Sequence, residues 1–444
     1  MVDALELSES VLKRLEGRFD DVAVLARQRD YVMVKLWNTE PSVTQSWIDT
    51  KVSVLVSKDG RVFSTELSVS DPDAVDNALR NVGEILAKLE PSEIYAPLPE
   101  PAEFKPLEGL VDQNVLKAME EPGKYVEVMI DAALKEGAER VAGTLVFGRM
   151  TKALATNKGF RGMEEGTEVE AYLRAFKGEF SGHWAHGSRI LDVNALREVG
   201  RRAGMYATIT SSKAEFTPGK YDVILSPLVV GNLIDTIGWM ASAMAVMMGF
   251  SMFMKVKPGD KVGSEAVTII DAPRDTELAE STAFDDEGVP TKDKPIIKNG
   301  VLTNILHNTG TAKKMGTEST GNAGWLFPTP WNLHVAPGNV KNEEELISEL
   351  RNGVIITNNW YTRLQNYVEG IFSTVSRDAA LLVKNGEIVG HLGRIRIADR
   401  FTNLLSNWEL ATKETHKIRW WEVETPTKAP YALIRQVNLT KPFI

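Results

Sequence analysis

The sequence predicts a fold of the α+β class, because of where its apolar residues recur. Residues 3–17 carry them at a helical spacing, whereas 21–37 and 46–69 alternate apolar and polar side chains with the period of two that is typical of strands. After residue 256, short apolar runs are separated by turn residues, and helical spacing is rare. Helices and strands therefore occur in separate runs, as they do in α+β proteins.

The first unit is predicted as a helix, a set of strands and a second helix. The helix over 3–17 ends at Gly17, a residue that often follows the last turn. Asp59-Gly60 lies between two alternating runs and is a typical sequence for a two-residue β-hairpin turn. The second helix has Asp71 as its cap and Pro72 at its first helical position, and it ends near residue 89.

A proline-rich segment divides the chain. Five of the twenty prolines lie between residues 91 and 106, which indicates an extended linker or strap. We therefore predict an N-terminal domain at 1–105, a middle α+β domain at 106–215 and a β-rich C-terminal domain at 216–444.

The middle domain begins with helical patterns and continues with strands. The helices are predicted over 110–120 and 122–136, and strand-like sequence then runs to about Phe180. A further helix follows Asp192, whose side chain can cap its first turn.

Turn signals recur in the C-terminal domain. The tripeptide Lys-Asn-Gly occurs at 298–300 and again at 384–386, each time between apolar runs, which predicts two β-hairpins. One short helix is expected over 342–352, with Asn342 as its cap and Gly353 as its stop.

An uncharged segment lies between Asp235 and Lys255, and its nineteen residues are about long enough to cross a bilayer. Glycine, serine and threonine offset its few strongly membrane-favouring residues, and no Lys or Arg cluster precedes it. Six of the chain's fourteen methionines lie here, and methionine fills irregular core space. We therefore expect a buried helix near 229–254, with no membrane span.

Composition narrows the class of protein. The chain has 444 residues, 43% hydrophobic and 25% charged, and a formal charge of −9, which does not favour binding to nucleic acid. No cysteine is present, so disulfides, thiolate metal ligands and cysteine nucleophiles are excluded. The first residues lack a signal-peptide pattern, and a cytoplasmic location is expected.

Candidate chemistry is sparse. His183 and His186 have a spacing that would share one helix face, but the glycines around them favour a strand or loop, where the rings point apart. Three carboxylates in a row, Asp285, Asp286 and Glu287, could bind a cation, orient a partner's backbone or form a solvated turn. No phosphate loop, dinucleotide motif or serine elbow is present.

Aromatic residues gather in "GWLFPTPWNLHV" and "NNWYT", where Trp325 and Trp331 are the largest side chains of the first string. They could line a groove for an extended peptide or fill the core of a sheet. The residues alone therefore predict an α+β protein without a convincing catalytic set.

Several strings, taken in order, resemble the TldD/PmbA family, once described as modulators of DNA gyrase. They are "FDDEGVPT", "IIKNGVLTNIL", "TESTGNAGW", "PWNLHVAPGN", "FSTVSRDAALLVKNGEIV" and "RIRIADRFTNLL". The resemblance covers nearly the full length and implies α/β units followed by a large, mostly antiparallel C-terminal domain. It also implies a cytoplasmic peptidase system of two related subunits.

The family's subunits differ in their metal motif. The TldD type carries H-E-x-x-x-H on a helix, with a later cysteine, and binds zinc; the PmbA type, also called TldE, has the same architecture without these ligands. Aligned through "GNLI", this chain places Asp235 at the first histidine position, Thr236 at the glutamate and Met240 at the second histidine position. The resemblance therefore implies no zinc in this chain and a zinc-binding TldD-type partner.

The resulting expectation is a helper subunit that is inactive alone and acts on extended peptides or unfolded proteins together with its partner. A homodimer in isolation is a further possibility. The candidate residues for substrate or interface contact are Phe284, Asp285, Asp286, Glu287, Gly288, Trp325 and Trp331. The alternatives are a hydrolase that acts alone through other ligands, such as His183 and His186, and a gyrase or nucleic-acid modulator.

Overall fold

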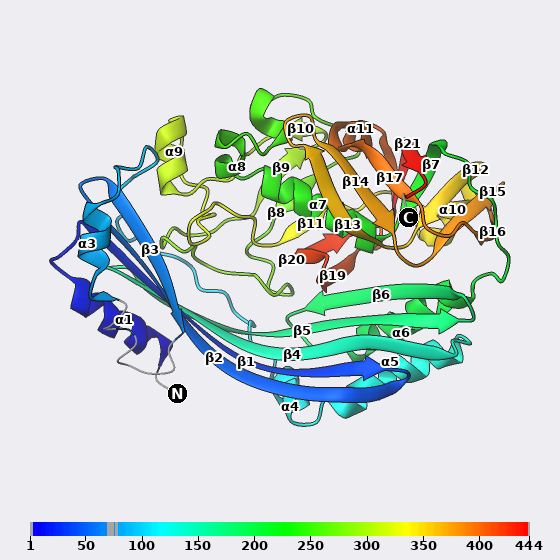
Figure 1. Ribbon diagram of the computed structural model, residues 1–444, viewed down its shortest axis with the longest axis horizontal. Coiled ribbons are helices and arrows are strands. Elements are labelled where there is room, and N and C mark those ends of the chain that lie inside the picture. The colour runs from blue at the N-terminus through cyan, green and yellow to red at the C-terminus, as the bar shows by residue number, and fades with distance from the viewer. Residues whose placement is uncertain (1–2, 69–74, 76–78, 443–444) are drawn as a thin grey trace.

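A long antiparallel sheet forms the base of the molecule (Figure 1). The computed structural model describes residues 3–68, 75 and 79–442, and the sheet has the strand order β3-β2-β1-β4-β5-β6. At about 3.3 Å per residue, the 17 residues of β1 extend roughly 56 Å. The strands are β1 (Asp21–Trp37), β2 (Glu40–Lys58), β3 (Arg61–Ser68), β4 (Arg140–Thr156), β5 (Arg161–Lys177) and β6 (Phe180–Ser188).

Helices cover one face of this sheet. At the first helix, the Asp3 side chain accepts N–H groups of Leu5 and Glu6, and Leu12 and Leu15 pack against the sheet. The Asp192 carboxylate caps a later helix as predicted and accepts the N–H of Asn194. The helices are α1 (Ala4–Leu15), α3 (Val82–Ala87), α4 (Gln113–Glu120), α5 (Gly123–Lys135) and α6 (Val193–Thr208).

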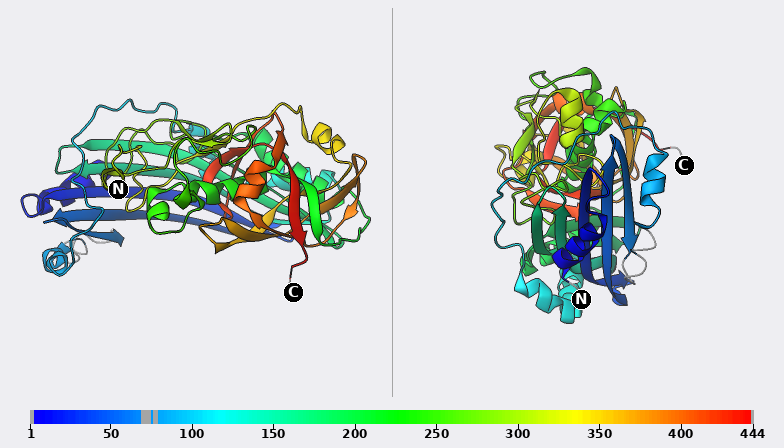
Figure 2. Two further views of the ribbon diagram at one scale, coloured as in Figure 1. Left: turned by 90° about the horizontal axis from the view of Figure 1, so that it is seen from above. Right: turned by 90° about the vertical axis from the view of Figure 1, so that its left-hand side faces the viewer.

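Two further sheets lie over the opposite face of the base (Figures 1 and 2). One has the order β10-β9-β8-β11-β20-β19, and the other runs β13-β14-β17-β21-β7-β12-β15-β16 with β18 beside β21. Only the β7/β12 and β11/β20 pairs are parallel among the described strand pairs, which confirms the predicted α+β class with a mostly antiparallel C-terminal region.

The bounds of these strands follow chain order. They are β7 (Gly219–Leu225), β8 (Ile269–Asp271), β9 (Lys294–Lys298), β10 (Val301–Leu302), β11 (Leu333–Val335), β12 (Asn352–Ile356), β13 (Asn359–Asn366), β14 (Ile371–Ser376), β15 (Ala380–Lys384), β16 (Glu387–His391), β17 (Arg396–Arg400), β18 (Trp408–Ala411), β19 (His416–Trp420), β20 (Val423–Ala429) and β21 (Ala432–Thr440).

The uncharged segment is three helices in place of the single buried helix expected near 229–254. The first ends where Leu306 forms a bridge beside Ser242, and the Ser251 hydroxyl donates to the carbonyl oxygen of Met240. Gly249 then takes a positive φ of 78°. The C-terminal region contains α7 (Pro227–Met240), α8 (Ala243–Met247), η1 (Met252–Lys255), α9 (Thr309–Met315), α10 (Glu343–Ser348) and α11 (Phe401–Ser406).

The predicted turns agree with the structure, but one predicted helix end does not. Asn299 and Asn385 have φ angles of 49° and 51°, and the glycine after each also has a positive φ, as two-residue hairpin turns require. Asn342 caps α10, yet Gly353 is not its stop: the helix ends at Ser348, and Gly353 lies within β12. The predicted cap Asp71 and Pro72 lie outside the described residues.

The proline-rich segment crosses the sheet as an extended strap. Residues 90–112 contain no helix or strand. The N–H of Leu98 and the hydroxyl of Tyr95 both donate to the Asp21 carboxylate at the start of β1. Strands from before and after this strap are direct neighbours, because β1 pairs with β4. No helix within the described residues has both the length and the apolarity needed to cross a membrane.

Candidate functional site

Helix α7 is held firmly in the C-terminal region. Most of its side chains are buried, and Asn232 forms its main polar anchor. The Asn232 amide nitrogen donates to the carbonyl of Glu422 at 2.6 Å, and its oxygen accepts from Asn359 and Thr362. The helix therefore has a fixed rotation, which decides where its other side chains point.

The three positions that the resemblance assigns to a zinc motif already have other roles. The Asp235 carboxylate accepts the N–H of Glu424 at 3.0 Å, and burial raises its pKa to about 6. The Thr236 hydroxyl donates to the carbonyl of Asn232 at 3.1 Å, and Met240 is 0% exposed. Each side chain is thus engaged within the fold.

These residues do not fit a hydrolytic zinc ion. Such an ion needs three nitrogen, oxygen or thiolate ligands and an open position for water, with a nearby general base. Asp235 supplies one carboxylate, the thioether of Met240 is buried, and Thr236 cannot act as the base. No group of three or more His, Cys, Asp or Glu within the described part of the chain is placed to hold a metal ion.

The acidic turn joins the C-terminal region to the base sheet. The Asp286 carboxylate is buried and pairs with Arg27 of β1 at 2.7 Å and with Lys152 of β4 at 2.9 Å. Burial raises the pKa of Asp286, but these two cations outweigh it and hold the pKa below its usual value. Because Arg27, Lys152 and Asp286 come from distant parts of the sequence, the triad links the two halves of the molecule.

The other two acids of the turn stabilise the turn itself. The Asp285 carboxylate accepts N–H groups from Glu287, Val289 and Ala323. Burial and the neighbouring Glu287 raise the pKa of Asp285, although the three N–H groups oppose this. Glu287 accepts both the N–H and the hydroxyl of Thr309 at the start of α9.

Aromatic packing surrounds this turn. The Phe284 ring lies 5.1 Å from the rings of both Phe104 in the strap and Phe160. Gly288 has φ +87°, and an added Cβ would come within 2.7 Å of the Phe160 ring, so only glycine fits here. We name the turn Phe284–Gly288, together with Arg27 and Lys152, the acidic latch.

The two tryptophans occupy different positions. Trp331 is buried beside the latch, where Lys152 lies 4.8 Å above its ring and its Nε1 donates to the carbonyl of Gly321. Trp325 reaches the base sheet, and its Nε1 donates to the Ser64 hydroxyl at 2.6 Å. The proposed contacts of these seven residues with substrate or partner stay predictions.

A small polar cavity of about 180 Å³ lies between the base sheet and the C-terminal region. Arg27, Lys152, Arg189, Glu164 and Trp331 are among its lining residues. The Arg189 guanidinium donates to several backbone carbonyls, including that of Ala279 at 2.6 Å. These contacts give the cavity a rigid, polar wall.

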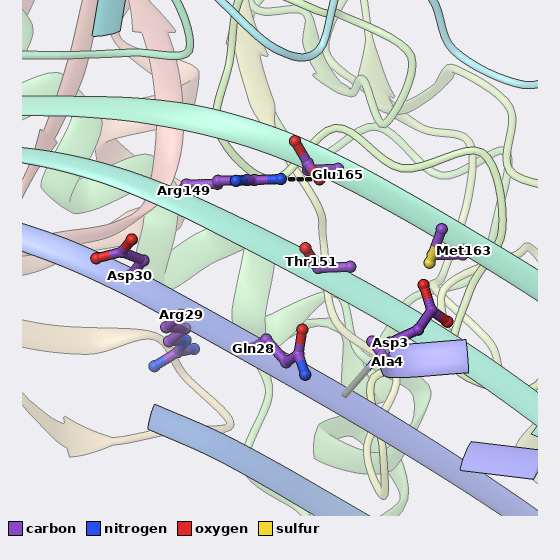
Figure 3. A pocket seen from close by; sticks show the side chains of 9 residues that line it. All are labelled: Asp3, Ala4, Gln28, Arg29, Asp30, Arg149, Thr151, Met163 and Glu165. Atoms are coloured by element: carbon purple, nitrogen blue, oxygen red, sulfur yellow. Dashed lines mark hydrogen bonds and ion pairs between the residues drawn. The ribbon is translucent and has the colours of Figure 1, made fainter. Parts of the chain in front are cut away.

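A second hollow, of about 270 Å³, lies on the helix-covered face of the sheet beside the start of α1 (Figure 3). Arg149 and Glu165 form an ion pair across it at 2.7 Å. Asp3, Arg29 and Asp30 also line it, so cations and acids are mixed. This hollow has no set of converging groups that would indicate a reaction.

The histidine pair lies on β6 and is built into the core. His183 contacts the Trp420 ring at 4.5 Å and its Nδ1 faces the Asn358 amide at 3.2 Å. Burial lowers the pKa of His183 to about 3 and that of His186 to about 4. Both imidazoles are therefore neutral at pH 7.

Two features were missed by reasoning from the sequence. Lys152, within "TKALAT", is a lone charge at an inward strand position, and this pattern predicts a buried carboxylate as its partner.

The end of α7, the residues after it and the turn between β13 and β14 also expose apolar side chains. We name these the Trp239 surface: Trp239, Met248, Phe250, Met254 and Tyr367, which are 44%, 53%, 39%, 50% and 37% exposed.

Comparison with known proteins places this geometry in a family. Residues 218–441 match the PmbA/TldA metallopeptidase C-terminal domain, and residues 22–86 match PmbA/TldA metallopeptidase domain 1. A metalloprotease of Methanothermobacter thermautotrophicus is 29% identical over 255 residues, which are 54% of this chain and 55% of the relative. In matches of this kind the chain spans about half the length of the curated relative.

Solved structures extend the likeness to the whole fold. A Thermotoga maritima protein described as a candidate modulator of a DNA gyrase has a TM-score of 0.82 and 27% identity, covering 98% of this chain and 99% of that one. TldE from Thermococcus kodakarensis also has a TM-score of 0.82, at 20% identity and the same coverage, and this likeness concerns the fold alone. The chain belongs to the PmbA/TldD family of metallopeptidases.

Proposed function

We propose that this chain is a non-catalytic subunit of a PmbA/TldD-type metallopeptidase and holds no zinc of its own. The observation that carries the proposal is the set of side chains at Asp235, Thr236 and Met240 on α7. One is a carboxylate engaged by backbone N–H groups, one is a hydroxyl bonded within the helix, and one is a buried thioether. Hydrolysis then requires a partner that supplies the metal, its ligands and the base.

The proposed partner is a TldD-type subunit carrying H-E-x-x-x-H. The Trp239 surface offers the apolar contact that such a pairing needs, because exposed aromatic and methionine side chains are common at interface centres. It is internally ordered: the Tyr367 ring contacts those of Phe250 at 5.2 Å and Trp239 at 6.3 Å. It also begins on α7 itself, so a partner bound there lies beside the helix that lacks the motif.

The proposed substrates are extended peptides and unfolded proteins, in a cytoplasmic setting. Strand β13 is an end strand of the nine-stranded sheet, and Asn359 and Thr362 at its start bond to Asn232 of α7. An extended peptide can add to such an edge through backbone hydrogen bonds, which requires little sequence preference. This mode suits an enzyme that processes many different chains.

Co-expression with a sibling that carries H-E-x-x-x-H tests the proposal. We expect an inactive, zinc-free chain when it is purified alone, and a co-purifying pair that contains zinc and cleaves an unfolded protein such as reduced casein. Replacing the sibling's motif glutamate should abolish cleavage by the pair. The proposal would be refuted if this chain, purified alone and freed of metal, cleaved the unfolded protein after zinc was added back.

The pairing surface has its own matched test. Trp239→Ser should weaken co-purification with the sibling, whereas Trp37→Ser, on the far hairpin and 70% exposed, should leave it unchanged. Both variants remove one exposed tryptophan, so they differ only in position. Loss of pairing in Trp37→Ser alone would move the interface to the β1–β2 hairpin.

The rival functions are separable. A hydrolase acting alone requires a ligand set outside α7, and it predicts activity without the sibling. A gyrase modulator, the description given to the Thermotoga maritima protein, predicts that the purified chain alters gyrase supercoiling in vitro. The formal charge of −9 does not favour contact with DNA.

A further inference from the structure

A hollow near one end of the base sheet carries more positive charge than the protein around it. It has a volume of about 510 Å³ and lies between β5, β6 and the segments that flank β15 and β16. We name it the basic hollow. Its charged lining consists of the cations Arg174, Lys213, Arg377 and Arg394 and the acids Glu179 and Asp378. Four cations and two acids leave two positive charges, in a chain whose formal charge is −9.

Both acids of the basic hollow already have cation partners. The Asp378 carboxylate pairs with Arg174 at 2.6 Å and accepts a hydrogen bond from Ser181. Glu179 pairs with Lys213 at 2.5 Å. Among the described residues, Arg377 and Arg394 have neither a hydrogen-bond acceptor nor an ion-pair partner. The two excess charges are therefore those of Arg377 and Arg394.

Arg377 is held in place although no carboxylate among the described residues forms an ion pair with it. Its guanidinium lies 5.4 Å from the Trp360 ring and 5.1 Å from the Trp421 ring, and these contacts fix its direction. Burial and the nearby Arg174 lower the pKa of Arg377, and this effect outweighs the opposing charges of Asp378 and Glu422. A partly desolvated cation of this kind is stabilised by any anion that can reach it.

His391 adds a second polar group to the wall of the basic hollow. His391 is 7% exposed, and its ring stacks on that of Phe180, with ring centres 4.3 Å apart. Nε2 is buried and has no hydrogen-bond partner in the described part of the chain. The ring also makes a backbone hydrogen bond to Thr210, which we assign to Nδ1 because Nε2 has no partner. Nε2 is then an acceptor for a ligand hydroxyl.

We propose that the basic hollow binds a small hydroxylated organic phosphate. The guanidinium groups of Arg377 and Arg394 donate to its phosphate oxygens, since arginine matches this geometry. A hydroxyl of the ligand donates to Nε2 of His391. The volume leaves room for a short carbon skeleton beside the phosphate. This site is independent of the proposed peptidase pairing and needs no metal.

Calorimetric titration of the full chain with glycerol phosphate, at neutral pH and low salt, tests the proposal. We expect saturable binding that Arg377→Ala and Arg394→Ala each weaken at least about tenfold, the size of one charge-assisted contact. Arg351→Ala removes an exposed arginine outside the hollow and should leave binding unchanged. No binding by the unmodified chain, or equal weakening in all three variants, overturns the proposal.

A second variant tests the histidine. His391→Phe keeps an aromatic ring stacked on Phe180 and removes Nε2. Arg394 is exposed, so Arg394→Ala should leave the fold intact and serves as the variant that controls for misfolding. The unmodified chain should prefer glycerol phosphate to sulfate, which has no hydroxyl to donate, and His391→Phe should lose this preference. A preference that His391→Phe retains overturns the assigned contact.

Discussion

The acidic latch contains a buried carboxylate and helix α7 contains a half-buried one, and the fold surrounds them differently. At the latch, Asp286 is paired with two cations, Arg27 and Lys152, that come from the base sheet. On α7, Asp235 is held by the N–H of Glu424 and by Thr425, without a cation. Their pKa values accordingly move in opposite directions, below the usual value for Asp286 and up to about 6 for Asp235.

This difference shows where the chain uses its acidic groups. The latch carboxylate joins two parts of the fold, so its ion pairs contribute to the packing of the C-terminal region on the base sheet. The α7 carboxylate lies at a position that catalytic relatives are expected to use for a metal ligand, yet here its bonds are those of a structural residue. Breaking each region should therefore affect different observables.

The largest effect is expected from Asp286→Ala. Removing this carboxylate leaves Arg27 and Lys152 unpaired near the core, and breaking a buried pair on one side costs about 3 to 5 kcal/mol. Urea unfolding should show this loss, whereas the exposed Glu318→Ala should change the free energy of unfolding by less than about 0.5 kcal/mol. A loss below about 1 kcal/mol would mean that the latch does not hold the two parts together.

Comparing Gly288→Ala with Gly393→Ala separates the steric cost of an added methyl group from the cost of a positive φ. An added Cβ meets the Phe160 ring at 2.7 Å in addition to the positive φ, whereas Gly393→Ala shares a positive φ of 69° and meets nothing within 4 Å. We expect Gly288→Ala to be the more destabilising by about 1 to 3 kcal/mol, as for overpacking. Thermal and urea unfolding of both variants measure this, and equal losses would show that the ring simply moves aside.

Asp235→Asn should change how the free energy of unfolding depends on pH. Because the folded pKa is raised to about 6 from 3.8, this carboxyl favours folding below the unfolded value, and that contribution is lost as the pH rises through 6. Relative to Asp235→Asn, the unmodified chain should lose about 1 to 3 kcal/mol between pH 4 and pH 7. A difference between the two proteins that stays constant with pH would contradict a half-buried Asp235 carboxyl that has no cation partner.

The smallest effect is expected from breaking the hydrogen bond between Trp325, in the loop beside the latch, and Ser64 of the base sheet. Ser64→Ala removes the acceptor of the Trp325 Nε1 hydrogen bond at 2.6 Å. The expected loss is about 0.5 to 1.5 kcal/mol, because the group is only partly buried. Ser68→Ala, on the same strand, controls for the substitution itself. Equal losses in the two variants would show that the contact adds nothing.

Local sequence patterns predicted much of the fold. Asp59-Gly60, both Lys-Asn-Gly turns and the Asp192 cap depend on the backbone preferences of neighbouring residues, and such preferences survive in the folded chain. The long uncharged segment differed, because Leu306, distant in sequence, pairs beside Ser242 and ends the helix. The end of α10 differed for a similar reason, since Gly353 pairs with Asp222 in the sheet.

The site was less predictable than the fold. The three acids of the turn were singled out, but the cations that give Asp286 its role lie more than a hundred residues earlier. Four residues of the Trp239 surface lie within a segment expected to be buried throughout, and their exposure depends on the break after α7. Long-range pairing thus decided what local patterns left open.

Zinc titration into the purified, metal-free chain tests the central claim most directly. The claim is that Asp235, Thr236 and Met240 on α7 cannot hold a hydrolytic ion, so calorimetry should show no saturable binding at one equivalent, and a Met240→Ala variant should behave identically. A single tight site of one equivalent that is lost in Asp235→Asn would contradict it.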